Sequence, residues 1–250
     1  MNKYNNRNKR EISDSYWLYG KHPVLMALNN PKRVVKKILC TPNAEKIIRD
    51  NIKPERLKGI EMEILSPDKI EGRLGRREEI THQGIAIEVK VLEQPEMESI
   101  VDFNLIVALD KITDPHNIGA IMRSAAAFGA GAVITQENGS PEENATIAKI
   151  SVGALEVIPY IRVSSLFKRL DELKEYGFKV IGLEGECEKD ISEIDKNGKY
   201  ILVVGSEGKG LSDVIKERCD ELVRINITDK IESLNASVAA AVALYSLTGK

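Results

Sequence analysis

The pattern of apolar and polar positions changes character part of the way along the chain. Between residues 81 and 92 apolar side chains stand at every second position, through Ile85, Ile87 and Val89, which is typical of a strand with one buried face. Apolar residues at helical spacing, with Pro23 in the first turn, predict a short helix over residues 20–30. The same criteria predict helices over 44–51 and 67–74 and strands over 34–40 and 60–65. These elements suffice for a small α/β domain.

From residue 100 onward the predicted strands are unbroken apolar runs. LIVAL at 105–109 and YILVV at 200–204 are clear examples. Such strands, alternating with helices, are typical of a parallel sheet covered on both faces. We expect strands over 105–109, 132–135, 178–183, 200–204 and 221–225 and helices over 117–128, 166–176 and 235–247. Ligands bind at the carboxyl ends of strands in such sheets, so the loops after residues 109, 204 and 225 are the candidate site.

The segment between these two patterns has the composition of a linker. EQPEMES at residues 93–99 is polar and acidic and contains a proline. We therefore predict four regions, which are a disordered basic tail over 1–14, a smaller α/β domain over 15–92, the linker over 93–99 and a larger α/β domain over 100–250.

The net charge of −2 hides a division between these regions. Residues 1–95 hold 19 basic and 13 acidic side chains, whereas residues 96–250 hold 17 basic and 25 acidic ones. A basic first part suggests an anionic partner such as RNA. No apolar run approaches the roughly 18 residues of a membrane span. Three widely spaced cysteines fit neither a disulfide framework nor a zinc site. We expect a cytoplasmic protein with no membrane partner and no metal.

The first candidate loop reads LDKITDPHNIGAIMRSAAAFGA and runs from a strand into a helix. Asp114 and Pro115 form a turn, and Asn117 is placed to cap the helix that follows. Arg123 lies six residues after Asn117, about 120° away from it around an ideal helix, but both side chains lie near the start of the helix, where they can converge on a ligand. A capped core helix whose Arg123 pairs with a carboxylate at the sheet edge would explain the same residues.

The second candidate loop, VVGSEGKGLSD, places glycines at 205, 208 and 210 directly after a buried strand. Glycine allows the backbone to approach a ligand closely or to take a positive φ. Leu211 stands where a P-loop needs lysine, and the glycine order is the reverse of the dinucleotide fingerprint, which argues against a dehydrogenase. Glu207 would repel a pyrophosphate but suits a cation or an amine. A tight turn with a solvated glutamate is the alternative.

The third candidate loop leads into a helix rich in small residues, within ESLNASVAAAVALY. Ser233 and Asn235 stand before that helix, where either side chain can accept from its first amide groups. Capping alone explains these two residues. It does not explain why three loops with polar residues and glycines all follow strands of one predicted sheet.

Together, DPHNIGAIMRSAAAFGA, VVGSEGKGLS and ESLNASVAAAVALY resemble the three motifs of the SpoU/TrmH branch of the SPOUT RNA methyltransferases, in that family's order and spacing. The resemblance covers residues 100–248. In the first part, YGKHPVLMAL and THQGIAI resemble the substrate-binding domain often joined to this branch. With both parts, the chain is most similar to the bacterial 23S rRNA guanosine 2′-O-methyltransferases.

The resemblance implies a fold and a chemistry that residue patterns alone do not predict. The larger domain would hold a trefoil knot in its C-terminal part, the cofactor would be S-adenosyl-L-methionine, and a homodimer would act on RNA, with rRNA favoured over tRNA. The catalytic residues of the family match Asn117, Arg123, Glu207, Ser233 and Asn235. The positions whose backbone holds the adenosyl group match Gly205, Ile225 and Leu234.

Two positions depart from the family pattern, which often has proline and glycine where this chain has Asn226 and Asp229. We expect these departures to shift the cofactor loop or its affinity for the cofactor, but they remove no matched polar residue. The open alternatives are a tRNA or another rRNA as the substrate, and an RNA-binding protein whose cofactor site is inactive.

Overall fold

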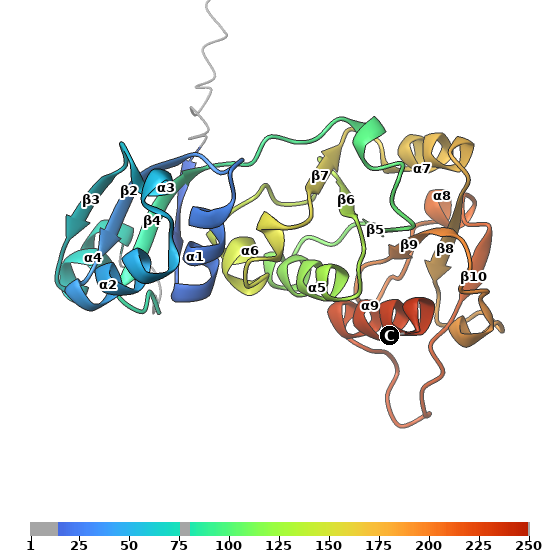
Figure 1. Ribbon diagram of the computed structural model, residues 1–250. Coiled ribbons are helices and arrows are strands. Elements are labelled where there is room, and N and C mark those ends of the chain that lie inside the picture. Colours follow the sequence, from blue (N-terminus) through green and yellow to red (C-terminus); the bar gives the residue numbers. More distant parts are fainter. Residues whose placement is uncertain (1–14, 76–80, 250) are drawn as a thin grey trace, which may run out of the picture.

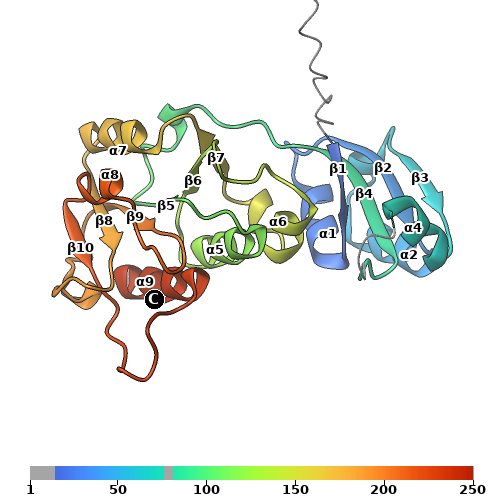
Figure 2. The ribbon, with the colours of Figure 1, turned by 180° about the vertical axis from the view of Figure 1, so that it is seen from behind.

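The computed structural model describes residues 15–75 and 81–249 and arranges them in two α/β domains, each built around its own sheet (Figures 1 and 2). The predicted basic tail over residues 1–14 lies outside the described residues. Within the described ranges, no helix has the length and apolar character that a membrane crossing requires.

The first domain holds the strands β1 (Ser15–Tyr19), β2 (Val35–Cys40), β3 (Glu61–Ile64) and β4 (Ile85–Lys90). Their order in the sheet is β1-β4-β2-β3, with β2 and β3 parallel and the other pairs antiparallel. Its helices are α1 (Lys21–Asn29), α2 (Pro42–Asn51), α3 (Pro54–Leu57) and α4 (Pro67–Leu74). The alternating side chains of Ile85, Ile87 and Val89 are all buried, as the pattern predicts.

Two details of this domain differ from the sequence predictions. The pattern does not reveal β1, because Tyr16 and Trp17 are successive residues and both are half-buried, so no alternation appears. β1 nevertheless pairs antiparallel with β4. The strand predicted over 81–92 is shorter in the structure, because Gln83 and Gly84 have positive φ angles of 54° and 78° and form a turn before it.

The second domain holds the strands β5 (Leu105–Leu109), β6 (Ala132–Gln136), β7 (Tyr160–Val163), β8 (Phe178–Leu183), β9 (Lys199–Val204) and β10 (Glu221–Val223). They form one parallel sheet in the order β10-β8-β9-β5-β6-β7, which confirms the predicted parallel α/β fold. β9 lies between β8 and β5, so the chain returns to the middle of the sheet after β8. The trefoil knot stays a prediction.

Helices cover both faces of this second sheet. They are α5 (Pro115–Ala127), α6 (Ala145–Ile150), α7 (Leu166–Glu175), α8 (Asp213–Lys216) and α9 (Ala236–Thr248), with short 3-10 turns η1 (Met97–Ser99), η2 (Ala154–Glu156) and η3 (Ile191–Glu193). α5 and α9 lie side by side below the sheet in Figure 1, and α7 and α8 lie above it. Leu105 and Val107 pack in the core with α5 and α9, whereas Ile106 packs in the core with α7. Burial on both faces explains the unbroken apolar run of β5.

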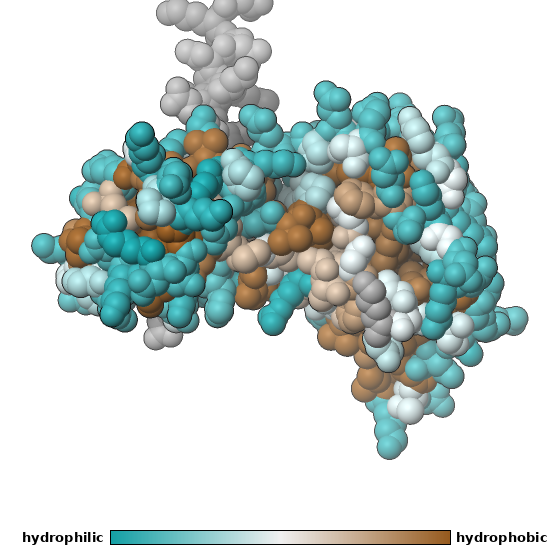
Figure 3. Space-filling model, in the orientation of Figure 1, coloured by the Kyte–Doolittle hydropathy of each residue, from teal (hydrophilic) through white to brown (hydrophobic). Residues whose placement is uncertain are grey.

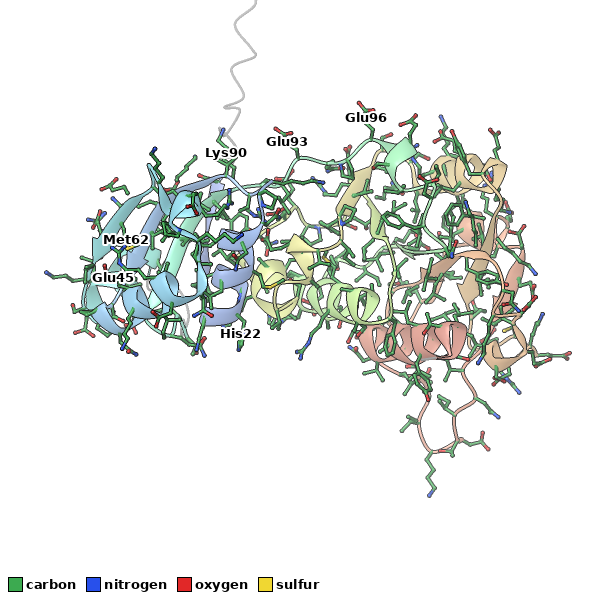
Figure 4. The ribbon with its side chains drawn as sticks, viewed as in Figure 1. His22, Glu45, Met62, Lys90, Glu93 and Glu96 are labelled. Carbon is green, nitrogen blue, oxygen red and sulfur yellow. The ribbon has the colours of Figure 1, made fainter. Side chains whose placement is uncertain are left out.

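The two domains touch directly as well as through the segment that joins them. That segment crosses along one edge of the molecule, with Glu93 and Glu96 pointing outward (Figure 4). Gln94 Oε1 accepts a hydrogen bond from the backbone N–H of Arg162 at 3.0 Å, which ties the segment to β7. α1 and β1 face α6 in both ribbon views (Figures 1 and 2). One apolar core continues from the first domain into the second.

Candidate functional site

Three polar side chains from separate loops meet at the carboxyl end of the parallel sheet. Nδ2 of Asn117 donates to Oε1 of Glu207 at 3.0 Å, and Nδ2 of Asn235 donates to Oδ1 of Asn117 at 3.0 Å. The Asn235 amide also donates to Oε1 of Glu207. Glu207 lies 90 residues from Asn117 and 28 from Asn235 along the chain, so the fold itself brings the three together.

Asn117 reaches this meeting point because another residue caps its helix. α5 begins at Pro115, and Oδ1 of the N-cap Asp114 accepts from the His116 N–H at 2.9 Å. The prediction that Asn117 caps the helix is therefore wrong. Asp114 offers a cap acceptor and Pro115 needs none at the first position, so the helix starts two residues earlier than the pattern suggests. Asn117 lies in the first turn and turns its amide toward the other two loops.

Asn235 caps the last helix with its side-chain oxygen and contacts the other two loops with its side-chain nitrogen. Its Oδ1 accepts from the N–H groups of Ser237 at 2.9 Å and Val238 at 3.4 Å, so the predicted cap of α9 is confirmed at this position. Its Nδ2 makes the hydrogen bonds to the other two loops. Ser233 lies two residues earlier, exposed, and makes no hydrogen bond to any other residue that the structure describes.

Glu207 lies in a loop that glycine makes possible. Ser206 and Gly210 exchange two backbone hydrogen bonds of 3.1 and 2.9 Å, which close the loop. A Cβ at Gly205 would lie 2.3 Å from the carbonyl carbon of Gly210, closer than any side chain permits. Gly208 and Gly210 take φ angles of 78° and 61°, which suit glycine. The predicted positive φ is therefore confirmed at Gly208 and Gly210, whereas the close approach at Gly205 is to the backbone of the loop itself.

Asp110 is a residue of this region that the motif analysis does not single out. It follows β5 directly and is 4% exposed. Its Oδ2 accepts from the backbone N–H of Ser212 at 2.7 Å, which fastens the end of the glycine loop to the first loop. The sequence signal that could have identified Asp110 is a charged residue directly after a strand that is apolar throughout.

Arg123 lies on the exposed side of α5, six residues after Asn117. Ile118, Ile121 and Met122 on the same helix are fully buried, so the helix packs its other side against the sheet. The side chain of Arg123 forms no ion pair or hydrogen bond with another residue in the described ranges. The alternative in which it pairs with a carboxylate at the sheet edge therefore does not hold, and its guanidinium is available to a ligand.

The three predicted cofactor positions lie at the ends of three elements of the second domain, with β8 standing between β9 and β10 in the sheet. Gly205 follows β9, Ile225 lies two residues after β10, and Leu234 precedes the cap of α9, and all three are half-buried. The bare backbone of Gly205 and the apolar side chains of Ile225 and Leu234 are the kinds of group that suit a purine nucleoside. Asn226 and Asp229 are both exposed in the loop between Ile225 and Leu234.

Both domains of the chain are similar to known proteins. A family model described as SpoU rRNA Methylase family matches residues 104–245, and one described as RNA 2′-O ribose methyltransferase substrate binding matches residues 17–95. The 23S rRNA (guanosine-2′-O-)-methyltransferase RlmB of Pseudomonas aeruginosa is 36% identical over 243 residues, which are 93% of this chain and 96% of that protein. A Bacillus subtilis protein, YacO, named as a TrmH family tRNA/rRNA methyltransferase, is 31% identical over 241 residues, covering 94% and 95%.

A solved structure shares the fold of the whole chain. The SpoU methyltransferase AviRb of Streptomyces viridochromogenes, crystallised with AdoMet, superimposes with a TM-score of 0.80 over 98% of this chain and 93% of its own, at 24% identity. The family matches cover both domains, and the two relatives align over more than nine-tenths of the chain. The chain therefore belongs to the SpoU rRNA methylase family, the SpoU/TrmH branch of the RNA 2′-O-ribose methyltransferases.

Proposed function

We propose that this protein methylates the ribose 2′-hydroxyl of a guanosine in 23S rRNA. Its family makes it an S-adenosyl-L-methionine-dependent RNA methyltransferase, and the proposal concerns the target and the residues that act. The RlmB relatives support the target, because they align with both domains of the chain. The observation that carries the proposal is the contact among Asn117, Glu207 and Asn235, one from each motif loop.

The chemistry asks little of the protein beyond alignment and one proton transfer. When bound, S-adenosyl-L-methionine supplies an electrophilic methyl group, and Gly205, Ile225 and Leu234 are the residues that would hold it. The ribose hydroxyl is a weak nucleophile that must lose its proton as it reacts. Asn117 and Glu207 would orient Arg123 or the ribose, and Ser233 and Asn235 of the third loop complete the set.

Arg123 is assigned to the reacting hydroxyl. The family resemblance implies a proton-accepting role for it. An arginine guanidinium stays protonated in proteins, however, so its own chemistry favours holding the neighbouring phosphate and stabilising the negative charge that develops on oxygen. The absence of an intramolecular partner for Arg123 among the described residues supports both roles.

The first domain is the proposed RNA grip, because it carries the basic excess of the chain. Lys53 and Lys58 are exposed on either side of α3. Replacing both by Glu should weaken RNA binding, measured by filter binding, and flatten its salt dependence, since each phosphate contact contributes about one unit to the slope. Lys168→Glu, an equally exposed lysine on α7, is the control. Equal loss with the control would contradict the assignment.

A homodimer is proposed through α9. Val238, Val242 and Tyr245 recur at helical spacing on one face of α9 and are 48%, 39% and 59% exposed. Figure 3 shows this apolar surface continuing over α9 and the loop below it. Contiguous exposed apolar surface of this kind marks an interaction site. Val242→Glu should give a monomer in sedimentation velocity, whereas Val214→Glu on α8 should not, and a dimer that withstands Val242→Glu would exclude this interface.

Mapping ribose methylation in total RNA from a strain without this protein tests the proposed target. We expect one 23S rRNA guanosine to lose its 2′-O-methyl group. Loss at a tRNA position would favour the alternative substrate, and an unchanged map together with no binding of S-adenosyl-L-methionine would favour an RNA-binding protein with an inactive site. An rRNA target and three unpaired cysteines support a cytoplasmic site of action.

A further inference from the structure

A buried ion cluster joins the two domains. Arg33, just before β2, is enclosed by Glu143, before α6, and Glu156, at the end of η2, and these side chains are 0%, 6% and 3% exposed. Its Nη2 lies 2.6 Å from Oε1 of Glu156, its Nε lies 3.1 Å from both oxygens of that carboxylate, and its Nη1 lies 2.5 Å from Oε1 of Glu143. One guanidinium thus bridges two carboxylates that come from different elements of the second domain.

The remaining bonds of the cluster divide cleanly between the domains. Tyr16 Oη donates to Glu143 at 2.8 Å, Asn30 Nδ2 donates to Glu156 at 2.7 Å, and the backbone N–H of Leu92 donates to Glu143 at 3.1 Å. Arg33 also donates from Nη1 to the backbone carbonyl of Lys90 at 2.8 Å, within the first domain. Every bond that crosses between the domains runs from a donor in the first domain to a carboxylate of the second. The basic and acidic division seen in the sequence therefore continues into the contact between the domains.

The cluster holds one more carboxylate than cation, so it depends on every donor. Burial raises the pKa of Tyr16 well above its usual value, as does the charge of Glu143, which keeps the hydroxyl neutral and donating. Burial alone would lower the pKa of Arg33, but its hydrogen bonds to Glu156 and the nearby charges outweigh this and raise it. Removing the guanidinium would leave two buried carboxylates without a counter-charge, which is unfavourable for the closed interface.

The interface between the domains is connected through α6 to α5, the helix that carries two of the proposed catalytic residues. Glu143 and Glu156 flank α6, and α6 packs so closely on α5 that a Cβ at Gly119 would lie 2.7 Å from Cβ of Ile150. α5 carries Asn117 and Arg123. Gly153 lies three residues after α6, and a Cβ there would lie 2.6 Å from Cγ of Met26 on α1. The packing therefore runs from α1 through the turn that follows α6 and through α6 to α5.

We propose that Arg33 is a positioning residue that holds the substrate-binding domain in one fixed orientation to α5, so that bound RNA is presented at a set place before Arg123. The segment over residues 93–99 then crosses an interface that stays closed, and the two domains keep the same relative orientation when substrate binds. The fixed orientation of the domains stands on the ion cluster alone, whereas the presentation of RNA before Arg123 rests on the proposed function.

The test uses the full chain and two readouts. Glu93 and Glu96 lie outward on the joining segment, so a glutamate-specific protease reports its local release by the appearance of cuts after these residues (Figure 4). Steady-state kinetics on a 23S rRNA fragment give KM and kcat separately, with calorimetry for S-adenosyl-L-methionine. The variants are Arg33→Met and, as a gentler change should that one not fold, Glu156→Gln. Glu142→Gln, which removes only the exposed pair with Arg162, is the matched control.

Arg33→Met should speed cleavage at this segment about tenfold, because the segment opens more often. It should raise KM for RNA about fivefold or more, since fewer molecules hold the binding-competent orientation, and leave cofactor affinity and kcat at saturating RNA unchanged. Wild-type cleavage rates in a folded Arg33 or Glu156 variant would overturn the proposal, as would faster cleavage with unchanged KM. If the wild-type protein methylates no rRNA, the proposed function fails, and the cleavage rates still decide whether the cluster holds the domains.

Discussion

Asn235 and Asn117 are joined by a hydrogen bond of 3.0 Å although 118 residues separate them in the chain. One caps α9 and the other lies in the first turn of α5, so this bond ties together the starts of two neighbouring helices. Glu207 accepts from both amides and from the Ala236 N–H at 3.4 Å. The arrangement makes Glu207 an acceptor that fixes the geometry of the other two loops.

Replacing Glu207 separates a positioning role from a role for its charge. Glu207→Ala leaves three donors without their acceptor, and a loss of ~1–3 kcal/mol would lower kcat about 5- to 150-fold. Glu207→Gln still presents an oxygen to the same donors and should keep kcat within about tenfold of wild type. Methyl transfer from labelled cofactor measures both, with cofactor binding as the folding control. If both variants are equally inactive, the negative charge itself is required.

Two glycines of the same loop make a matched pair for testing the cofactor position. In Gly205→Ala the new methyl group would lie 2.3 Å from Gly210 and 2.5 Å from the Leu211 nitrogen, so the loop must open. We expect the affinity for S-adenosyl-L-methionine to fall about tenfold or more, the equivalent of ~1.4 kcal/mol. Gly208→Ala meets no atom within 4 Å and adds only the strain of its φ of 78°. Calorimetry that finds both variants binding like wild type would place the cofactor elsewhere.

Two of the three cysteines, Cys40 and Cys219, should be unreactive in the folded protein. Burial raises the pKa of Cys219 to about 12 and that of Cys40 to about 11. Because the thiolate is the reactive form, a thiol reagent at pH 8 should modify both slowly, and much faster after unfolding in denaturant. Because folding raises the pKa of both thiols, the free energy of unfolding is independent of their ionisation below about pH 8.5. It falls as the pH rises from there toward the raised pKa values. Fast modification of either cysteine at pH 8 in native protein would contradict this burial.

What the sequence predicts here is what neighbouring residues encode. The run of β5 reveals a strand buried on both faces, and the glycines around Glu207 reveal a tight loop, because each property is local. The hydrogen bond between Asn117 and Glu207 joins residues that only the folded chain brings together, so it could not be predicted from the sequence. Asp114 caps α5 in place of Asn117, and the Asn117 side chain is therefore able to make that bond. Arg33 looks like any surface cation in the sequence, because its partners Glu143 and Glu156 are 110 and 123 residues away.

The most direct test of the account is methyl transfer by Arg123→Ala. With labelled S-adenosyl-L-methionine and a 23S rRNA fragment, turnover should fall roughly 100- to 1,000-fold, the loss expected for a donor that stabilises charge in the transition state. Cofactor affinity should stay unchanged, and Arg169→Ala on α7, across the sheet, should behave like wild type. Turnover above about 3% of wild type by Arg123→Ala would contradict the assignment of Arg123 to the reacting hydroxyl.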